Sequence, residues 1–240
     1  MKGLLYYHVY QRSKDKREVF KKTNDALVFI SILSIKAKKF GVSIPALCLM
    51  DNHIHILVGV PEEDTLNSFV SETISLFTRR YNKEHIREGS LFKRPFGSAL
   101  KNSDKYVRNC ISYIYNNPVE AKKCRKIEDY VWNLIAYYNN SYPFSKPFVV
   151  RRALHKLKQS YYELKDIVKE NKPLNYTLLR HLFEGLPKEE SKQLRDMLIS
   201  FYNPIEYDNL IYYFGSYEKA LLAINSFNGS EYQLKEDDRI

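Results

Sequence analysis

Apolar residues recur along the first 100 positions with two different periods, and the alternation between these periods predicts the fold class. Short stretches that are apolar, or that alternate apolar with polar side chains, predict strands at residues 4–10, 42–50, 53–60 and 91–100. Two longer stretches carry apolar residues three and four positions apart, which predicts one helix from Thr23 or Asn24 to Gly41 and another after Asp64. This order of elements is typical of a ferredoxin-like α+β fold, in which helices flank one side of an antiparallel sheet.

A further helix is predicted to start at residue 103 or 104. At 100° per residue, its buried stripe consists of Val107, Cys110, Ile111 and Ile114. Tyr113 and Asn117 project about 40° apart at one border of that stripe, whereas Tyr115 projects roughly 160° away from Asn117. Pro118 disfavours helical geometry at Asn117 because its ring crowds the preceding residue. A tyrosine and an amide are therefore expected to point the same way, one turn apart.

The pattern changes after Pro143 and Pro147. Amphipathic stretches separated by prolines and a glycine predict helices at residues 151–170, 176–184, 188–202 and 216–225. We interpret residues 146–240 as a smaller all-helical domain that follows a domain formed by residues 1–145. A helix-turn-helix DNA reader and a module for packing or protein contact both fit this region. The acidic residues 235–238 are expected to form a solvated tail.

The apolar runs and the cysteines of the sequence indicate the cellular compartment in which the protein is expected. No run of about 18 uncharged apolar residues occurs, and the start of the chain lacks the apolar core of a signal peptide. We therefore expect a soluble cytoplasmic protein with no membrane partner. The three cysteines Cys48, Cys110 and Cys124 are odd in number and lack Cys-x-x-Cys spacing, which favours reduced core thiols over disulfides or zinc ligands.

The net charge of +10 lies entirely in the first 150 residues. They contain 24 Lys and Arg against 14 Asp and Glu, whereas residues 151–240 contain 14 of each. A basic segment of this kind favours a polyanionic partner such as nucleic acid, although many basic proteins never bind one. The candidate DNA-binding residues are Arg12, Arg79, Arg80, Lys93, Arg94, Lys101 and Lys105.

Two histidines share one face of the predicted strand at residues 53–60. Side chains of a strand alternate between faces, so His53 and His55 lie on one face while Ile54 lies on the other. Two neutral imidazoles at a fixed separation supply half of a divalent-metal site. The alternative is a pair of polar positions on a half-buried strand.

Four ordered stretches carry a family resemblance. Residues 7–12 (YHVYQR), 50–55 (MDNHIH), 89–96 (GSLFKRPF) and 113–121 (YIYNNPVEA) resemble the successive motifs of single-tyrosine HUH transposases of the IS200-like group. The resemblance is strongest to the branch called REP-associated tyrosine transposases and covers about residues 4–140.

The resemblance implies an HUH nuclease fold for the first domain and a role for each matching residue. His53 and His55 would hold Mg²⁺ or Mn²⁺, Tyr113 would be the nucleophile, and Asn117 would complete the metal site. The implied activity is metal-dependent cleavage and strand transfer of single-stranded, hairpin-containing DNA through a 5′-phosphotyrosine intermediate. This chain departs from the family in having Asp51 where proline is usual and a less apolar ending at residues 121–124.

Two other functions have to be weighed. A domesticated hairpin-binding regulator would keep the fold without the reaction, but the retention of His53, His55 and Tyr113 together argues against it. A relaxase or replication initiator would use the same chemistry, but those enzymes usually order the motifs differently. A homodimer and a monomer both fit the family, and the protein is expected at the nucleoid when DNA is bound.

Overall fold

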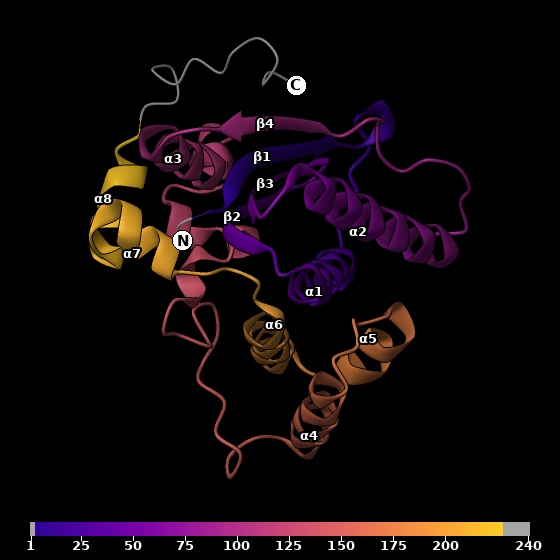
Figure 1. The fold of residues 1–240 in the computed structure, drawn as a ribbon. Helices are drawn as coiled ribbons and strands as arrows, with labels where there is room; N and C mark the ends of the chain where they lie inside the picture. The colour runs from indigo at the N-terminus through magenta and orange to yellow at the C-terminus, as the bar shows by residue number, and fades with distance from the viewer. Residues whose placement is uncertain (1–2, 228–240) are drawn as a thin grey trace.

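A four-stranded antiparallel sheet forms the centre of the computed structural model, which describes residues 3–227 (Figure 1). The strand order is β2-β3-β1-β4, as in a ferredoxin-like fold, and confirms the predicted α+β class. The strands are β1 (Leu5–Arg12), β2 (Ser43–Met50), β3 (His53–Val60) and β4 (Gly97–Lys101). β2 is an edge strand, and its pairing with β3 is irregular between Ser43 and Ala46, on either side of Pro45. A proline is tolerated there because an edge strand need not donate every N–H.

Helices flank both faces of the sheet. α1 (Thr23–Phe40) and α2 (Glu63–Glu84) cover one face, where they pack on Val9, Leu47 and Ile54. α3 (Asp104–Glu120) covers the opposite face, where it packs on Tyr6, Cys48 and Leu57 (Figure 1). The expectation that the two helices of the ferredoxin-like unit lie on one side is therefore confirmed, and α3, which follows that unit, covers the other side.

Two local expectations need correction. The strand predicted at residues 91–100 is confined to β4, and residues 91–96 form a loop that touches β1 through an isolated bridge from Ser13 to Phe92. Pro95 interrupts this segment because it has no N–H for a strand ladder. The second correction concerns Pro118, since α3 continues through it to Glu120. Burial of Tyr115 and Pro118 against the rest of the molecule outweighs the local penalty at the residue before proline.

The region after residue 150 folds into five helices within the described residues. They are α4 (His155–Lys169), α5 (Tyr176–Phe183), α6 (Lys188–Tyr202), α7 (Asp208–Phe214) and α8 (Tyr217–Asn225). Short 3₁₀ turns occur earlier in the chain, as η1 (Lys14–Lys16), η2 (Ile127–Asp129), η3 (Val131–Asn133) and η4 (Ile135–Tyr137). Sequence periodicity did not predict α7, which has only seven residues and buries only Asn209 and Leu210.

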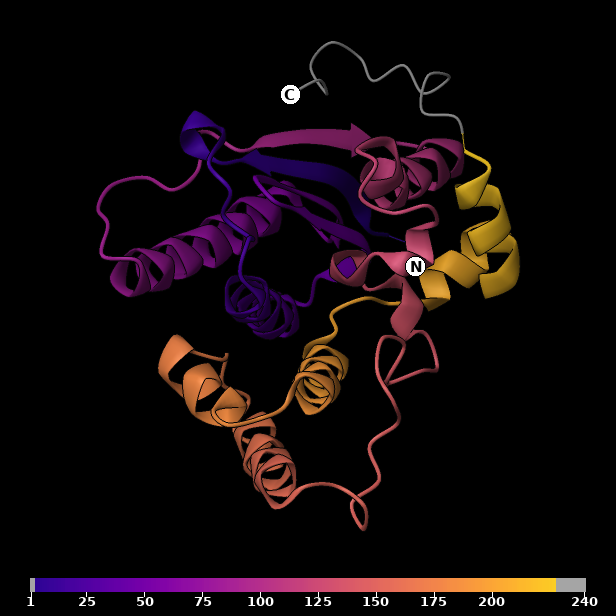
Figure 2. The ribbon, with the colours of Figure 1, turned by 180° about the vertical axis from the view of Figure 1, so that it is seen from behind.

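The C-terminal helices share the hydrophobic clusters of the sheet region. α5 and α6 lie beside α1, α4 packs against α6, and α7 and α8 lie beside α3 (Figure 1, Figure 2). Buried Asp25 of α1 accepts a hydrogen bond of 2.9 Å from the Tyr176 hydroxyl of α5 and lies 2.8 Å from His85 Nε2. The segment between α6 and α7 adds a backbone hydrogen bond of 3.1 Å from Glu206 N to Ile44 O of β2. The domain boundary at residue 145 stays a prediction.

Other sequence expectations concern cysteines and membrane crossing. Cys48 and Cys110 are buried, Cys124 is half-buried, and all three are free thiols. Across residues 3–227, no helix is both long and apolar enough to traverse a bilayer. The acidic residues 235–238 lie outside the described part of the chain.

Candidate active site

The candidate site lies on the sheet face that α3 covers. β1 and β3 are antiparallel neighbours, and their register places His55 opposite Tyr10 and His53 opposite Arg12. Residues directly opposite each other share a face, so these side chains line one side of the sheet together with His8, two positions before Tyr10. The two histidines of the predicted metal site are thus joined by a third from the first strand.

The three imidazoles are in contact. His55 is 2% exposed, and its Nδ1 lies 2.9 Å from Nε2 of His8. The ring of His53 stands edge-on to that of His55 at a centroid distance of 5.0 Å. On its other side, Nδ1 of His53 lies 2.7 Å from Oδ1 of Asn52. Because an amide oxygen only accepts, His53 carries its proton on Nδ1 and leaves the Nε2 lone pair for another ligand.

Burial keeps the three histidines neutral. It lowers the pKa of His8 to about 3, assisted by the nearby Lys101, and the pKa of His53 to about 4, assisted by Arg12. The pKa of His55 also falls well below its ordinary value through burial and through the neighbouring imidazoles. At neutral pH these side chains therefore have lone pairs available, which is the form that binds a metal.

Tyr113 brings a phenol to the same place from α3. It is half-buried, and its ring stands edge-on to His55 at 5.5 Å and to His8 at 5.7 Å. Tyr115 points elsewhere: it is fully buried, and its hydroxyl donates a hydrogen bond of 3.3 Å to the Pro45 carbonyl. The positions of the two tyrosines confirm the helical-wheel argument. The catalytic role of Tyr113 stays a prediction.

Asn117 follows Tyr113 by one turn. Its Nδ2 donates a hydrogen bond of 2.8 Å to the Tyr113 carbonyl, so Oδ1 is the atom of this amide that can ligate a cation. No group of three or more His, Cys, Asp or Glu side chains suited to a metal occurs among residues 3–227. A metal bound here would therefore combine His53 and His55 with amide or phosphate oxygens. The donor chemistry fits Mn²⁺, which accepts both imidazole and oxygen, better than Mg²⁺, which prefers oxygen alone.

A glycine on β4 makes room for the ring of Tyr10, which lies next to His8. Gly97 lies opposite Tyr10, and the Tyr10 ring occupies the space where a Cβ at this position would be, 1.9 Å from Cζ. The same ring lies 5.7 Å from that of His8. β4 can therefore pair with β1 at Tyr10 because residue 97 has no side chain.

The structure gathers some of the predicted DNA-binding residues and separates others. Arg12 lies beside His53, and the exposed Lys93 is attached to the end of β1 by a backbone hydrogen bond of 2.9 Å to Arg12 O. Arg94 is the next residue of the same exposed loop. Arg79 and Arg80 lie on α2, across the sheet from the histidines. Arg80 is engaged there with the carbonyls that precede α5.

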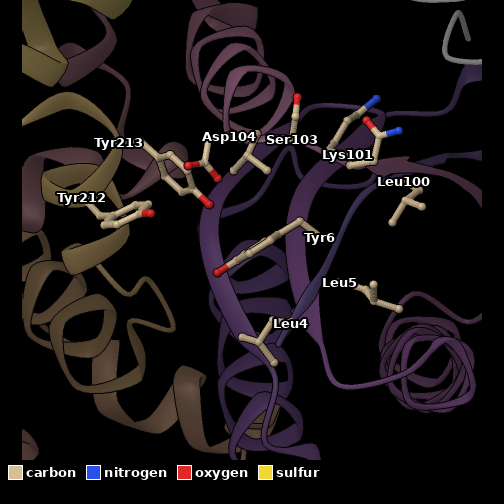
Figure 3. A pocket seen from close by; sticks show the side chains of 11 residues that line it. Leu4, Leu5, Tyr6, Leu100, Lys101, Ser103, Asp104, Tyr212 and Tyr213 are labelled. Atoms are coloured by element: carbon tan, nitrogen blue, oxygen red, sulfur yellow. The ribbon is translucent and has the colours of Figure 1, made fainter. Parts of the chain in front are cut away.

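Lys101 borders a separate cleft at the end of β4, and Lys105 borders a hollow next to it. The cleft has a volume of about 570 Å³. Figure 3 shows its lining, with Tyr6 and Lys101 from the sheet, Asp104 from α3, and Tyr212 and Tyr213 from α7. Lys105 lines an adjoining hollow with Arg108. Tyr212 and Tyr213 of α7 line both the cleft and the hollow, and the buried Lys101 also acts electrostatically on His8.

Some residues of the site were not predicted from the sequence. His8 and Tyr10 stand in the first motif, but nothing in the pattern revealed that β1 pairs with β3 so that they meet His55. Their alternation with Arg12 was a signal, since the three share one strand face. Lys123 was also missed, and it forms an ion pair of 2.5 Å with Asp51, the residue that replaces the usual proline.

Comparisons with known proteins show what this region is similar to. Residues 2–117 match the family model described as "Transposase IS200 like". These residues make up just under half of the chain, and they are similar to the IS200-like transposase family. The chain is 24% identical over 141 residues to a Haemophilus influenzae protein named as a REP-associated tyrosine transposase, and the match covers 55% of this chain and 78% of the relative. A solved structure of a REP-associated tyrosine transposase bound to a REP hairpin aligns over 56% of this chain and 78% of its own, with 18% identity and a TM-score of 0.46.

Proposed function

We propose that this chain is an IS200-like transposase that cleaves and rejoins single-stranded DNA with Tyr113 as the nucleophile. The observation that carries the proposal is the contact between Tyr113 and His55, two residues 58 positions apart whose rings lie 5.5 Å from each other. His53 and His55 would hold Mn²⁺ or Mg²⁺, with Asn117 as a further oxygen ligand. When bound, the metal would polarise the scissile phosphate and offset the negative charge that develops on it.

The reaction follows from the chemistry of a phenol. Tyr113 loses its proton and its oxygen attacks phosphorus, forming a 5′-phosphotyrosine bond while the bond to the 3′ oxygen breaks. The departing oxygen takes up a proton and becomes a 3′-hydroxyl. Attack of a different 3′-hydroxyl on the phosphotyrosine reverses the step and regenerates Tyr113. Because one phosphodiester replaces another, strand transfer requires no external energy source.

The proposed substrate is single-stranded DNA that folds into hairpins. The net charge of +10 in residues 1–150 suits a polyanion, and Arg12, Lys93 and Arg94 lie at the same end of β1 as His53. The Haemophilus influenzae relative is named for its association with REP sequences. We extend that substrate class to this chain as part of the proposal.

The test is formation of a covalent adduct. The full chain is incubated with labelled hairpin DNA and Mn²⁺, and the products are separated under denaturing conditions. We expect a labelled protein band with the wild type and none when EDTA is present. Tight hairpin binding without any adduct would instead favour a regulator that has lost the reaction.

A further inference from the structure

We propose that His8 is a positioning residue that sets the tautomer of His55 and thereby determines which nitrogen of His55 faces the metal. This inference rests on the proposed function in one respect, because it takes His55 to be a metal ligand. It assigns a role to a histidine that lies outside the His53-Ile54-His55 motif.

The surroundings of His8 fix its ring. The side chain is fully buried, and its ring lies edge to edge with that of His55, with centroids 5.1 Å apart and an angle of 24° between the planes. Tyr10 and Tyr113 each lie 5.7 Å from it, and Gly97 lets the Tyr10 ring settle against β4. An imidazole enclosed in this way cannot swing toward the metal position without displacing an aromatic ring.

The hydrogen bond between His8 and His55 has a direction that metal binding would determine. If Nε2 of His55 binds the metal, the proton of His55 is on Nδ1 and is donated across 2.9 Å to Nε2 of His8. His8 then carries its own proton on Nδ1. That atom is buried and has no hydrogen-bond partner within the described chain, so this tautomer leaves an N–H unsatisfied, and metal binding at His55 has to offset that cost.

Asn52 supplies the matching contact for the other histidine. Its Oδ1 accepts from Nδ1 of His53, just as Nε2 of His8 would accept from Nδ1 of His55. Both imidazoles of the motif would then present Nε2, and each would be oriented by a neighbour that does not touch the metal. This shared arrangement distinguishes His8 from a histidine that only fills space in the core.

The first experiment measures Mn²⁺ binding to the full chain by loss of the free-ion EPR signal. His8→Ala is expected to weaken binding about 10- to 100-fold, the usual effect of removing a partner that orients a metal-binding histidine. His8→Gln keeps a side-chain acceptor and should recover most of that loss. His85→Ala is the matched control, because His85 also makes a histidine hydrogen bond, to Asp25, but lies outside the site. Wild-type affinity in a folded His8→Ala variant would overturn the proposal.

The second experiment avoids substitution altogether. Long-range ¹⁵N NMR on the wild-type chain with Zn²⁺, a diamagnetic substitute, reports the tautomer of each histidine. We expect Nε2 of His55 to be metal-bound and its Nδ1 to be protonated, and coordination through Nδ1 would refute the role of His8. If His53→Ala and His55→Ala also leave Mn²⁺ binding unchanged, the metal site of the proposed function fails, and this result differs from a failure at His8 alone.

Discussion

The ring of Tyr113 stands edge-on to the imidazole of His55, with centroids 5.5 Å apart and planes at 85°. One residue comes from α3 and the other from β3, so the contact depends on how the helix packs across the sheet. The hydrophobic cluster that fixes this packing includes Ile114 of α3 and Leu57 of β3. The position of the candidate nucleophile is therefore a property of the folded core.

Loss of either motif histidine should remove metal-dependent cleavage. His53→Ala and His55→Ala each take away one of the two imidazoles proposed to bind the metal, so we expect cleavage to fall by orders of magnitude and Mn²⁺ affinity to decrease. Cleavage assays and Mn²⁺ titration check this. His155→Ala, on the distant α4, is the control. Full cleavage in the presence of EDTA would contradict metal assistance.

Acid should destabilise the metal-free protein through the buried histidines. The pKa of His53 is lowered to about 4 and that of His8 to about 3, whereas in the unfolded chain both are near 6.5. The unfolded state then binds more protons, so stability present above pH 6.5 is lost as the pH falls toward these lowered values. Urea denaturation in EDTA between pH 7 and pH 4 measures the effect. His8→Gln should flatten the curve, and an unchanged curve would count against the neutral, buried state of His8.

A side chain at residue 97 should disturb the histidine site indirectly, through Tyr10. Gly97→Ala places a methyl group in the space of the Tyr10 ring, and relief of that overlap requires Tyr10 or β4 to move. We expect a loss of about 1–3 kcal/mol in the free energy of unfolding and reduced Mn²⁺ affinity, since Tyr10 packs against His8. The control is Ser98→Ala, at an exposed position of β4. Gly89→Ala would not serve, because Gly89 has a φ of +80° and any side chain there would strain the backbone. If Gly97→Ala were as stable as the wild type, the Tyr10 ring would be able to move aside without cost, and the prediction would be wrong.

Removal of the C-terminal helices should destabilise the transposase region. A chain ending at residue 150 would expose the α1 surface that α5 and α6 cover, and would lose the hydrogen bonds from Glu206 and Tyr176. We expect a lower urea midpoint than for the full chain, together with weaker DNA binding by the partly folded product. A fragment as stable as the full chain would show that residues 146–240 form an independent domain.

Local periodicity predicted much of this site, and long-range pairing was needed for the rest. The two-residue repeat of strands placed His53 and His55 on one face, and the helical repeat set Tyr113 apart from Tyr115. Both arguments use only neighbouring positions. His8 was missed because its contact with His55 depends on the register between β1 and β3, 47 positions apart, which no local pattern encodes. Arg80 was predicted to bind DNA because of its charge. In the structure it forms hydrogen bonds with two carbonyls that lie more than 90 positions further along the chain, a pairing that no local pattern encodes.

The most direct test of the central claim is the identity of the residue that becomes attached to DNA. Wild-type protein is reacted with hairpin DNA and Mn²⁺, digested, and the DNA-linked peptide is identified by mass spectrometry. The account predicts that the DNA is joined to Tyr113, that Tyr113→Phe forms no adduct while still binding the hairpin, and that Tyr115→Phe still forms it. Attachment to Tyr115, or an undiminished adduct with Tyr113→Phe, would contradict the assignment of Tyr113 as the nucleophile.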